Sequence, residues 1–504
     1  MTFQELKAAY LHLDYEEFTN KIQKNLQNGL KNISPSEVAS RDDHRDYLTL
    51  LNKYRMAIDA GTQFYGANFK ERITAMLSAG EDGVYTNSLR YIFELIQNVD
   101  DCEFRDRTNC SLQIYFDEQL GRIVLFYNET GFTPFNVFAV TGIAEAAKNI
   151  SDGNVQIGEK GIGFKSVFGV AHRVWIQSGK FSFELDGRNF CVPIPVYDNR
   201  YEEIHGTKLT LFMDASKVRN TYEKACQTYR YSDSVFQNNP ILFLNKLTEI
   251  CFCNNTGKSL TFSVSRHEDI EGAEHAFEAN VRLSAVFSGF GTDQKEDCSI
   301  RCIRFTLPIK FTREECISRY GSSTKLTGQT LRMQVIFPEV SELSKISQGA
   351  FYSYLPTEVR LNVPIACHVP FKLDTSREYV DSQNQNQWFI HCCSEFSRLM
   401  RSAYRHYAQK YTVASKHYNE VVYFLPSVDE PLFKQTNDRI KCLERPEFRG
   451  NTFSQRDIFY SAIGNFLPAS QLCYFQSEHS LINPQKLCKY LNISLEAIVF
   501  PDSR

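Results

Sequence analysis

The chain has 504 residues, of which 56 are Lys or Arg and 59 are Asp or Glu, so its formal net charge is −3. Because 42% of the residues are hydrophobic and 13% aromatic, the chain can bury large cores, which excludes a disordered chain, a collagen-like repeat and a coiled coil. At about 150 residues per domain, the length predicts roughly three domains. The even charge balance argues against a surface built mainly to hold nucleic acid or an anionic membrane, and leaves a local patch open.

The sequence shows no signal for a membrane or for export. No stretch approaches 18 uninterrupted apolar residues, and residues 1–15 read as a mixed helix rather than as a basic segment followed by an apolar one. We therefore expect a cytoplasmic protein without a membrane partner. The 15 cysteines include no C-x-x-C spacing, so close pairs such as Cys251 and Cys253 are interpreted as reduced thiols rather than zinc ligands.

Residues 1–80 are predicted to form a helical N-terminal extension, because apolar residues recur at steps of three and four. Leu48, Leu51 and Tyr54 show this spacing. The polar stretch 32–46 interrupts the pattern and predicts a loop.

Residues 81–235 are predicted to form a mixed domain. Helical spacing marks 88–102 and 215–231, and a second helix is expected to begin at Gly163. Alternating residues predict strands over 112–116, 122–127, 173–178, 180–185 and 207–212. Short hairpin connections favour an α+β fold, a two-layer α/β sandwich with helices on one face of a mixed, largely antiparallel sheet.

A second α+β domain is predicted over residues 236–411, which are rich in strands such as 331–337 and are closed by a helix over 387–411. Residues 412–504 contain short elements around several prolines and are predicted to form a small C-terminal α/β region.

One helix carries three polar residues on a single face. Glu94, Asn98 and Asp101 are four and seven residues apart, so they fall within about 60° of one another around the helix. An amide oxygen can coordinate magnesium, and a carboxylate can orient or deprotonate a water molecule. The spacing alone also fits a solvated helix face, so both interpretations stay open at this point.

A glycine-rich segment follows. Gly158, Gly161 and Gly163 precede Lys165, and backbone N–H groups of such a turn can close on an anion at a helix N-terminus. The dinucleotide fingerprint fits only with its last glycine replaced, and the P-loop pattern fails by one residue. A structural turn is the alternative. The residues before this turn are polar, whereas both phosphate motifs follow an apolar strand.

Taken together and in order, these segments resemble the GHKL ATPases. The N box is similar to Glu94-x-x-x-Asn98-x-x-Asp101, the first glycine box to Asn128-Glu-Thr-Gly131-Phe, and the second to Gly158-x-x-Gly161-x-Gly163-Phe-Lys165-Ser. The segment His205-Gly-Thr207 resembles the strand that closes the site. The ATP-binding modules of sacsin and of the plant NO VEIN proteins are similar almost residue for residue, over about 89–211.

The resemblance implies ATP and Mg²⁺ as cofactors and assigns roles by position. Glu94 resembles the general base, Asn98 the magnesium ligand, and Asp101 a residue that supports the pocket. The resemblance places the following residues around ATP: Asn98, Asp101, Glu129, Gly131, Lys148, Gly158, Gly161, Ile162, Gly163, Phe164, Lys165 and Thr207. Within this set Lys148 resembles a lid lysine.

Two departures from the family concern the first glycine box, where Glu129 replaces the usual aspartate and Thr133 stands in the last glycine position. The longer carboxylate weakens the inference that the base is adenine.

A second resemblance places Arg377 in a loop similar to the S-R-E loop of the heat-shock chaperones, whose arginine reaches the γ-phosphate. An ion-paired surface arginine is the alternative for Arg377.

The predicted function is magnesium-dependent ATP hydrolysis coupled to closure of a lid and of the second domain, in a chaperone-like, assembly or switch role. The alternative is a nucleotide-binding scaffold or sensor, for example in cellular defence, with little or no hydrolysis. ATP and a protein partner or client are expected, and a homodimer is one form of such a partner. Nucleic acid is open but unsupported, and a histidine kinase and an oxidoreductase are disfavoured.

Overall fold

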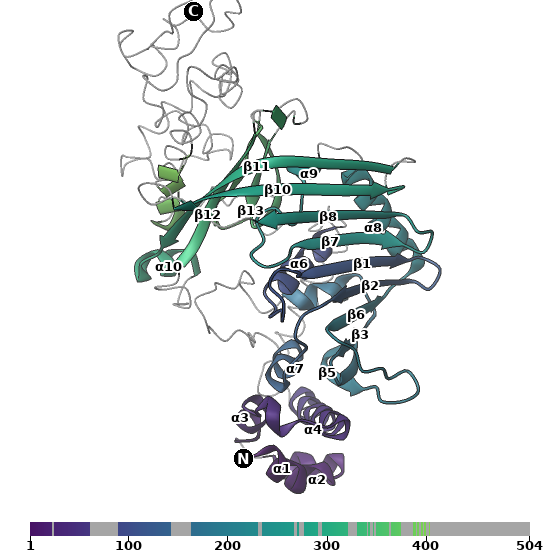
Figure 1. Cartoon of the computed structure of the whole chain (residues 1–504). Helices are drawn as coiled ribbons and strands as arrows, with labels where there is room; N and C mark the ends of the chain where they lie inside the picture. The colour runs from purple at the N-terminus through teal and green to yellow at the C-terminus, as the bar shows by residue number, and fades with distance from the viewer. Residues whose placement is uncertain are drawn as a thin grey trace, which may run out of the picture.

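The structure is a computed structural model in which helices pack on a large mixed sheet, so the fold is α+β (Figure 1). It describes residues 1–22, 25–60, 89–142, 163–229, 234–266, 270–271, 277–290, 295–320, 330–339, 341–342, 346, 349–361, 364–373 and, between 387 and 403, residues 387–389, 391–392, 395–396, 398–399 and 403. The last group is helical, as the sequence predicts for the helix that closes the second region.

The sheet has fifteen strands in the order β14-β13-β15-β12-β11-β10-β8-β7-β1-β2-β6-β3-β4-β5, with β9 paired to β10. The strands are β1 (Ser111–Asp117), β2 (Arg122–Tyr127), β3 (Arg173–Ser178), β4 (Phe181–Asp186), β5 (Asn189–Pro195), β6 (Thr207–Phe212), β7 (Glu249–Asn254), β8 (Ser259–Arg266), β9 (Ile270–Glu271), β10 (Phe277–Ser288), β11 (Lys295–Lys310), β12 (Thr330–Pro338), β13 (Gly349–Ser353), β14 (Leu355–Leu361) and β15 (Ala366–His368). Among these strands, β1 and β7 pair in parallel, as do β13 and β15, and the other pairs are antiparallel.

The described helices are α1 (Phe3–Leu6), η1 (Lys7–Leu11), α2 (Tyr15–Lys21), α3 (Asn25–Lys31), η2 (Pro35–Glu37), α4 (Arg41–Ala60), α6 (Arg90–Asp100), α7 (Pro134–Val140), η4 (Gly163–Gly169), α8 (Ala215–Thr228), α9 (Ser234–Gln237) and α10 (Arg313–Tyr320). The sequence predicts an ordinary helix at Gly163, whereas η4 is a 3₁₀ helix. The tighter turn matches the short, glycine-bounded sequence Gly163–Gly169.

Strands from both sides of the predicted boundary near residue 235 belong to this one sheet. The joint is the parallel pair of β1 and β7, in which Leu112 lies opposite Ile250 and Ile114 opposite Phe252. These four side chains are buried and point to the same face of the sheet. The apolar alternation of β1 and β7 therefore continues without a break across the joint.

Helices α8 and α9 lie behind the sheet in the view of Figure 1. Tyr222 of α8 packs edge-on against Phe116 of β1, and Tyr229 packs against Phe252 and Phe262 of β7 and β8. Helix α6 is linked to α8 by a hydrogen bond of 3.0 Å between the hydroxyls of Tyr91 and Thr221. This face of the sheet, called the inner face below, therefore carries the core.

The N-terminal helices pack at the end of the sheet beside β5 (Figure 1). Asn52 of α4 donates to the carbonyl of Pro193 in β5 at 2.7 Å, so the extension covers this edge strand.

Helix α4 begins at Arg41, although the polar sequence predicts a loop up to residue 46. The hydroxyl of Ser40 accepts a hydrogen bond from the N–H of Asp43, and the Asp43 carboxylate accepts from the N–H of Ser40, so a capping box starts the helix among polar residues.

The turn into β6 needs a glycine for two independent reasons. Gly206 has φ +102°, and a Cβ there would lie 2.3 Å from the carbonyl oxygen of Tyr127. Gly206→Ala is therefore expected to lower the free energy of unfolding by about 3 kcal/mol, since conformational strain and a backbone clash add. Gly257, with φ +78° and nothing near its Cβ position, is the matched control, with about 1 kcal/mol expected for Gly257→Ala. Urea unfolding monitors both variants, and equal losses would contradict the clash.

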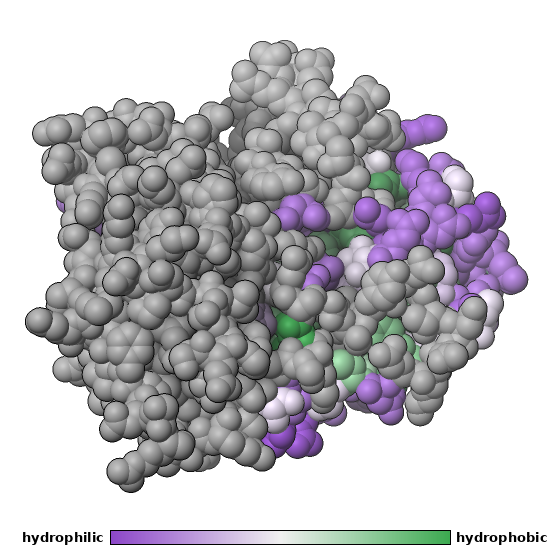
Figure 2. Space-filling view, turned by 90° about the horizontal axis from the view of Figure 1, so that it is seen from above, coloured by the Kyte–Doolittle hydropathy of each residue, from purple (hydrophilic) through white to green (hydrophobic). Residues whose placement is uncertain are grey.

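None of the described helices is both long and apolar enough to cross a bilayer. Seen from above, hydrophilic residues make up most of the described surface that is visible, and hydrophobic residues show only in small areas between them (Figure 2).

Candidate functional site

The helix that carries the predicted N box is buried on nearly all sides. Glu94 is only 7% exposed, and its carboxylate accepts a hydrogen bond from Arg90, one turn earlier, at 3.3 Å. The interpretation of this helix as a solvated face therefore does not fit the structure. A buried carboxylate held by a buried guanidinium has a fixed direction, which a residue that orients a water molecule requires.

Asn98 lies one turn after Glu94 and is half-buried. Its amide nitrogen is buried, and in the described part of the chain it has no hydrogen-bond partner. Leaving such a group without a partner costs about 1–3 kcal/mol. A side-chain amide can also turn to present its oxygen, so Asn98 is suited to a ligand.

Asp101 is half-buried and caps the C-terminus of α6. Its neighbour Asp100, which sequence reasoning did not single out, is 1% exposed and accepts three backbone hydrogen bonds, from Asn245 at 2.8 Å, Lys246 at 2.7 Å and Leu247 at 2.9 Å. Burial raises the pKa of Asp100, and the three N–H donors oppose that effect. Asp100 therefore fastens α6 to the loop that leads into β7.

The first glycine box centres on Glu129, which is 5% exposed. One carboxylate oxygen accepts from the N–H of Gly131 at 2.9 Å, and the other accepts a short hydrogen bond from the hydroxyl of Thr207. Thr207 also contacts the hydroxyl of Ser178 at 2.5 Å, and Ser178 accepts from the N–H of Phe132 at 2.7 Å. We call Glu129, Thr207 and Ser178 the carboxylate network.

The backbone around this network is tied to α6. The N–H of Thr130 donates to the carbonyl of Glu103 at 2.8 Å, just after the end of α6. Gly131 adopts φ +97°, a conformation that favours glycine. Thr133, which stands where the family has another glycine, caps α7 through a reciprocal pair of hydrogen bonds with Asn136. The threonine therefore has a structural role at this position.

The N-terminal extension holds α7 at both ends. The hydroxyl of Tyr47 donates to the carbonyl of Pro134 at 2.8 Å, and the guanidinium of Arg55 donates to the carbonyl of Phe138 at 2.7 Å. Arg55 also lies over the ring of Phe138, 4.5 Å from its centroid. Since α7 follows the first glycine box directly, the extension fixes the helix next to the candidate site.

Part of the second glycine box is described. Helix η4, which begins at Gly163, contacts α6, so the two predicted boxes are neighbours. Phe164 is half-buried and packs edge-on against Phe168. Lys165 is 2% exposed and donates to the carbonyl of Phe190 at 2.5 Å. Burial lowers the pKa of Lys165 to about 8, and this arrangement accounts for the side chain without a phosphate.

Five predicted site residues, Lys148, Gly158, Gly161, Ile162 and Arg377, lie outside the described residues. Of the others, Glu94, Asn98 and Asp101 lie along α6, and Glu129, Gly131 and Thr207 lie around the carboxylate network. Gly163, Phe164 and Lys165 lie on η4, which contacts α6, but the side chain of Lys165 is hydrogen-bonded to Phe190 instead. Sequence reasoning missed Ser178 and Asp100. Ser178 lies opposite Thr207 in the pairing of β3 with β6, so a correct strand register would have found it, whereas Asp100 depends on a contact 145 residues away.

A magnesium ion would have to be held by few protein groups. In the described part of the chain, no three His, Cys, Asp or Glu side chains gather as they would around a metal ion. Magnesium is commonly bound by one or two side chains together with substrate phosphates and waters. The lone amide of Asn98, with Glu94 one turn away, fits that mode of binding, in which the metal would neutralise phosphate charge.

The charge state of Glu129 gives a prediction that does not depend on any ligand. Burial raises the pKa of Glu129 above its usual 4.5, although Thr207 and Gly131 oppose the effect. The contribution of Glu129 protonation to the free energy of unfolding is then fully present below pH 4.5. It is lost as the pH rises through the pKa of Glu129 in the folded state. We expect Glu129→Gln to gain stability relative to wild type across that window and to keep the gain at pH 8.

The glutamine side chain of this variant can satisfy the carboxylate network, because its oxygen can accept from Gly131 and its NH₂ can donate to Thr207. The measurement is urea unfolding of both proteins between pH 4 and 8, where each pKa unit corresponds to about 1.4 kcal/mol. A difference that does not change with pH would show that Glu129 does not titrate in this range.

No protein-family model matches the chain. A stretch of 115 residues is 36% identical to Protein NO VEIN of Arabidopsis thaliana. This stretch makes up 23% of this chain and 4% of the Arabidopsis protein. The stretch is thus a small part of the Arabidopsis protein. This similarity is compatible with the resemblance to NO VEIN-type modules drawn from the motifs.

Proposed function

We propose that this chain is a GHKL-type ATPase, which binds Mg²⁺ and ATP against α6 and hydrolyses the nucleotide, with the two-layer sandwich of that family forming the site. The observation that carries the proposal is the pair of Glu94 and Asn98 on one buried helix. Glu94 has a fixed direction, and Asn98 has an amide nitrogen without a partner in the described chain. An amphipathic surface helix would have no reason to bury either group.

Each residue of the site has a role that follows from its chemistry. Glu94 orients the attacking water and accepts its proton. Asn98 takes one metal position through its amide oxygen. The carboxylate network lies on the base side of the nucleotide: each oxygen of Glu129 already accepts one hydrogen bond, and its second lone pair can accept from an exocyclic amino group.

The wider role that we propose is a chaperone-like, assembly or switch function. In this role ATP closes the predicted lid, and a protein partner binds the closed form. The N-terminal extension supports this proposal because Tyr47 and Arg55 fix α7, the helix that leads into the predicted lid. A closing segment needs one rigid end to act against.

The runner-up is a nucleotide-binding scaffold or sensor with little or no hydrolysis. The observation in its favour is the ion pair of Arg90 with Glu94. One oxygen of this carboxylate is already occupied by the guanidinium hydrogen bond, so it is less available to a water molecule. The two proposals agree on binding and differ only on turnover.

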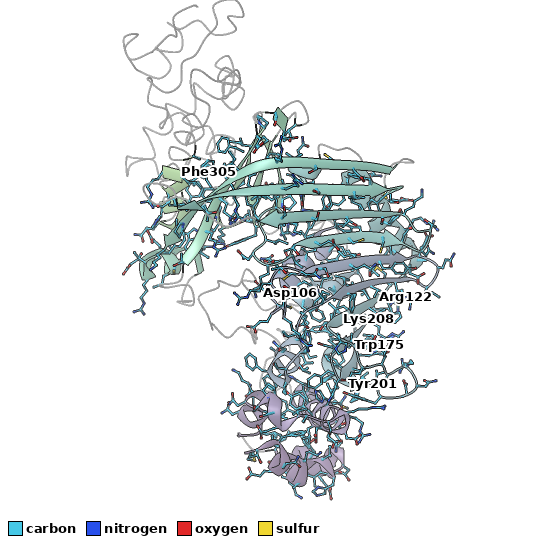
Figure 3. All side chains as sticks on the ribbon, in the orientation of Figure 1. Asp106, Arg122, Trp175, Tyr201, Lys208 and Phe305 are labelled. Atoms are coloured by element: carbon cyan, nitrogen blue, oxygen red, sulfur yellow. The ribbon has the colours of Figure 1, made fainter. Side chains whose placement is uncertain are left out.

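Calorimetric titration of the full chain with ATP tests the shared part, once with Mg²⁺ and once with a chelator. We expect tighter binding with Mg²⁺, and we expect Asn98→Ala to remove about tenfold or more of the magnesium-dependent gain. The control is Lys208→Ala, since Lys208 follows Thr207 in β6 and therefore lies on the opposite face of the sheet (Figure 3). Wild-type protein that binds no ATP under either condition would end both proposals.

A further inference from the structure

One buried lysine has no counter-charge among the described residues. Lys165 of η4 is 2% exposed. Its ammonium group donates to the carbonyl of Phe190 in β5 at 2.5 Å, and no carboxylate of the described residues pairs with it. Buried charges are normally paired, because the removal of a charge from water costs far more than one carbonyl hydrogen bond returns. The described position of Lys165 therefore does not favour its charged form.

The other described neighbours of this ammonium group do not supply an anion either. The rings of Phe164 and Phe190 lie 5.8 Å and 5.4 Å from Nζ, and Phe168 stacks on Phe190. A ring face attracts a cation by only about 0.5–2 kcal/mol. Burial lowers the pKa of Lys165 to about 8, and the positive charge of Arg55 acts in the same direction. The surroundings thus hold the side chain without neutralising its charge.

The helix that carries Lys165 is longer than its geometry normally allows. Helix η4 is a 3₁₀ helix over the seven residues Gly163–Gly169, whereas 3₁₀ helices rarely exceed three or four residues, since their hydrogen bonds are poorly aligned. Successive residues turn by about 120° in a 3₁₀ helix and by about 100° in an α-helix. A change to α geometry would therefore turn Lys165 by about 40° relative to Gly163 without unfolding the helix.

A structural tie between η4 and β5 is the other explanation for the bond from Lys165 to Phe190. Such a tie needs a hydrogen-bond donor but not a charge, and a neutral donor would be buried at a lower cost. The tie therefore leaves the charge of Lys165 unexplained. Helix η4 also contacts α6, which carries Glu94 and Asn98, so a group that leaves β5 remains close to the candidate site.

We propose that Lys165 has two positions, the described one on the carbonyl of Phe190 and a second one on the phosphate groups of a bound nucleoside triphosphate. This inference rests on the proposed function, because it needs a nucleotide beside η4 and α6. In the second position the phosphate oxygens supply the negative charge that the first position lacks. Lysine binds phosphate as a point charge, so the ammonium group does not need one fixed direction of approach.

A derivative of ATP with an acyl group on its terminal phosphate tests the second position, in the full chain with Mg²⁺. An amine beside that phosphate attacks the acyl carbon, an amide bond forms, and the bond from this carbon to the phosphate oxygen breaks, which releases ATP. Peptide mass spectrometry locates the acyl group. We expect it on Lys165, and we expect an excess of ATP to suppress this labelling. Acetic anhydride, which needs no nucleotide site, should label the half-buried Lys208 faster than Lys165.

Three variants separate the proposal from a structural tie. In Lys165→Met, an apolar side chain suits the aromatic surroundings but cannot bind phosphate, so the Kd for ATP with Mg²⁺ should rise about tenfold or more. The Tm should fall by no more than about 2 °C, because the removal of a buried charge offsets the lost hydrogen bond. Lys165→Arg, which keeps the charge, should regain part of the affinity. Lys53→Met is the control, since Lys53 also donates to backbone carbonyls, those of Leu11 and Leu13, and its Kd should not change.

The outcomes distinguish this inference from the proposed function. Labelling of another lysine in place of Lys165, or a lower Tm with an unchanged Kd in Lys165→Met, would overturn the inference and leave the proposed function standing. If the wild-type chain binds neither ATP nor its acyl derivative, the proposed function fails and the inference fails with it.

Discussion

Replacement of Asp100 with alanine is expected to lower the free energy of unfolding by about 3–5 kcal/mol, because three backbone N–H groups lose their buried acceptor at once. The carboxylate is 1% exposed and receives hydrogen bonds from Asn245, Lys246 and Leu247. Water cannot easily replace it in such a closed place. Urea unfolding followed by circular dichroism measures the loss.

Two further variants separate this effect from a general effect of charge. Asp100→Asn keeps one oxygen for Lys246 and Leu247 but presents an NH₂ group to the N–H of Asn245, so about 1–3 kcal/mol should be lost. Asp106→Asn, at an exposed turn labelled in Figure 3, keeps its local hydrogen bonds and should cost less than about 0.5 kcal/mol. Equal losses for the Asp100 and Asp106 variants would refute the role of Asp100.

The second large effect concerns catalysis. If the chain hydrolyses ATP, Glu94→Gln should lower kcat by about 100-fold or more, since a general base contributes 10²–10⁴ to a rate. The Kd for ATP should stay within about threefold of wild type, because the amide oxygen of glutamine still accepts from Arg90. Phosphate release and calorimetry measure the two quantities. Glutamine is preferable to alanine, which would leave Arg90 without this carboxylate.

Glu103→Gln serves as the control for this experiment, since Glu103 is exposed just after α6. Turnover by the Glu94 variant at the wild-type rate would show that another group acts as the base. Tight binding of Mg²⁺ and ATP by a wild-type protein without measurable turnover would instead select the scaffold or sensor.

The strands of the first region were largely predictable, because alternating burial needs only the local sequence. The predicted strand 173–178 is confirmed residue for residue by β3, and 207–212 by β6. Strand β5 was missed, since Pro193 and Pro195 interrupt its pattern. Proline is tolerated at a sheet edge, where not every N–H needs a strand partner, and β5 lies at that edge.

The candidate site was predictable only where its residues lie close together in the sequence. The turn of helix between Glu94 and Asn98 follows from spacing alone, and the burial of this helix confirms that these residues do not form a solvated face. The contact of Asp100 with residues 245–247 could not be predicted, because it depends on how α6 packs against a distant loop. The burial of Lys165 was equally inaccessible, since the spacing of glycines does not say where the next side chain points.

The parallel pairing of β1 with β7 limits how the two halves of the molecule can move. A hinge between them would have to break the ladder that runs from Ser111 to Phe116 on one side and from Glu249 to Asn254 on the other. A continuous sheet resists such a break but allows twist to be passed along its strands. Any signal from α6 to the far strands would therefore travel as a change in sheet twist rather than as a swing of two rigid bodies.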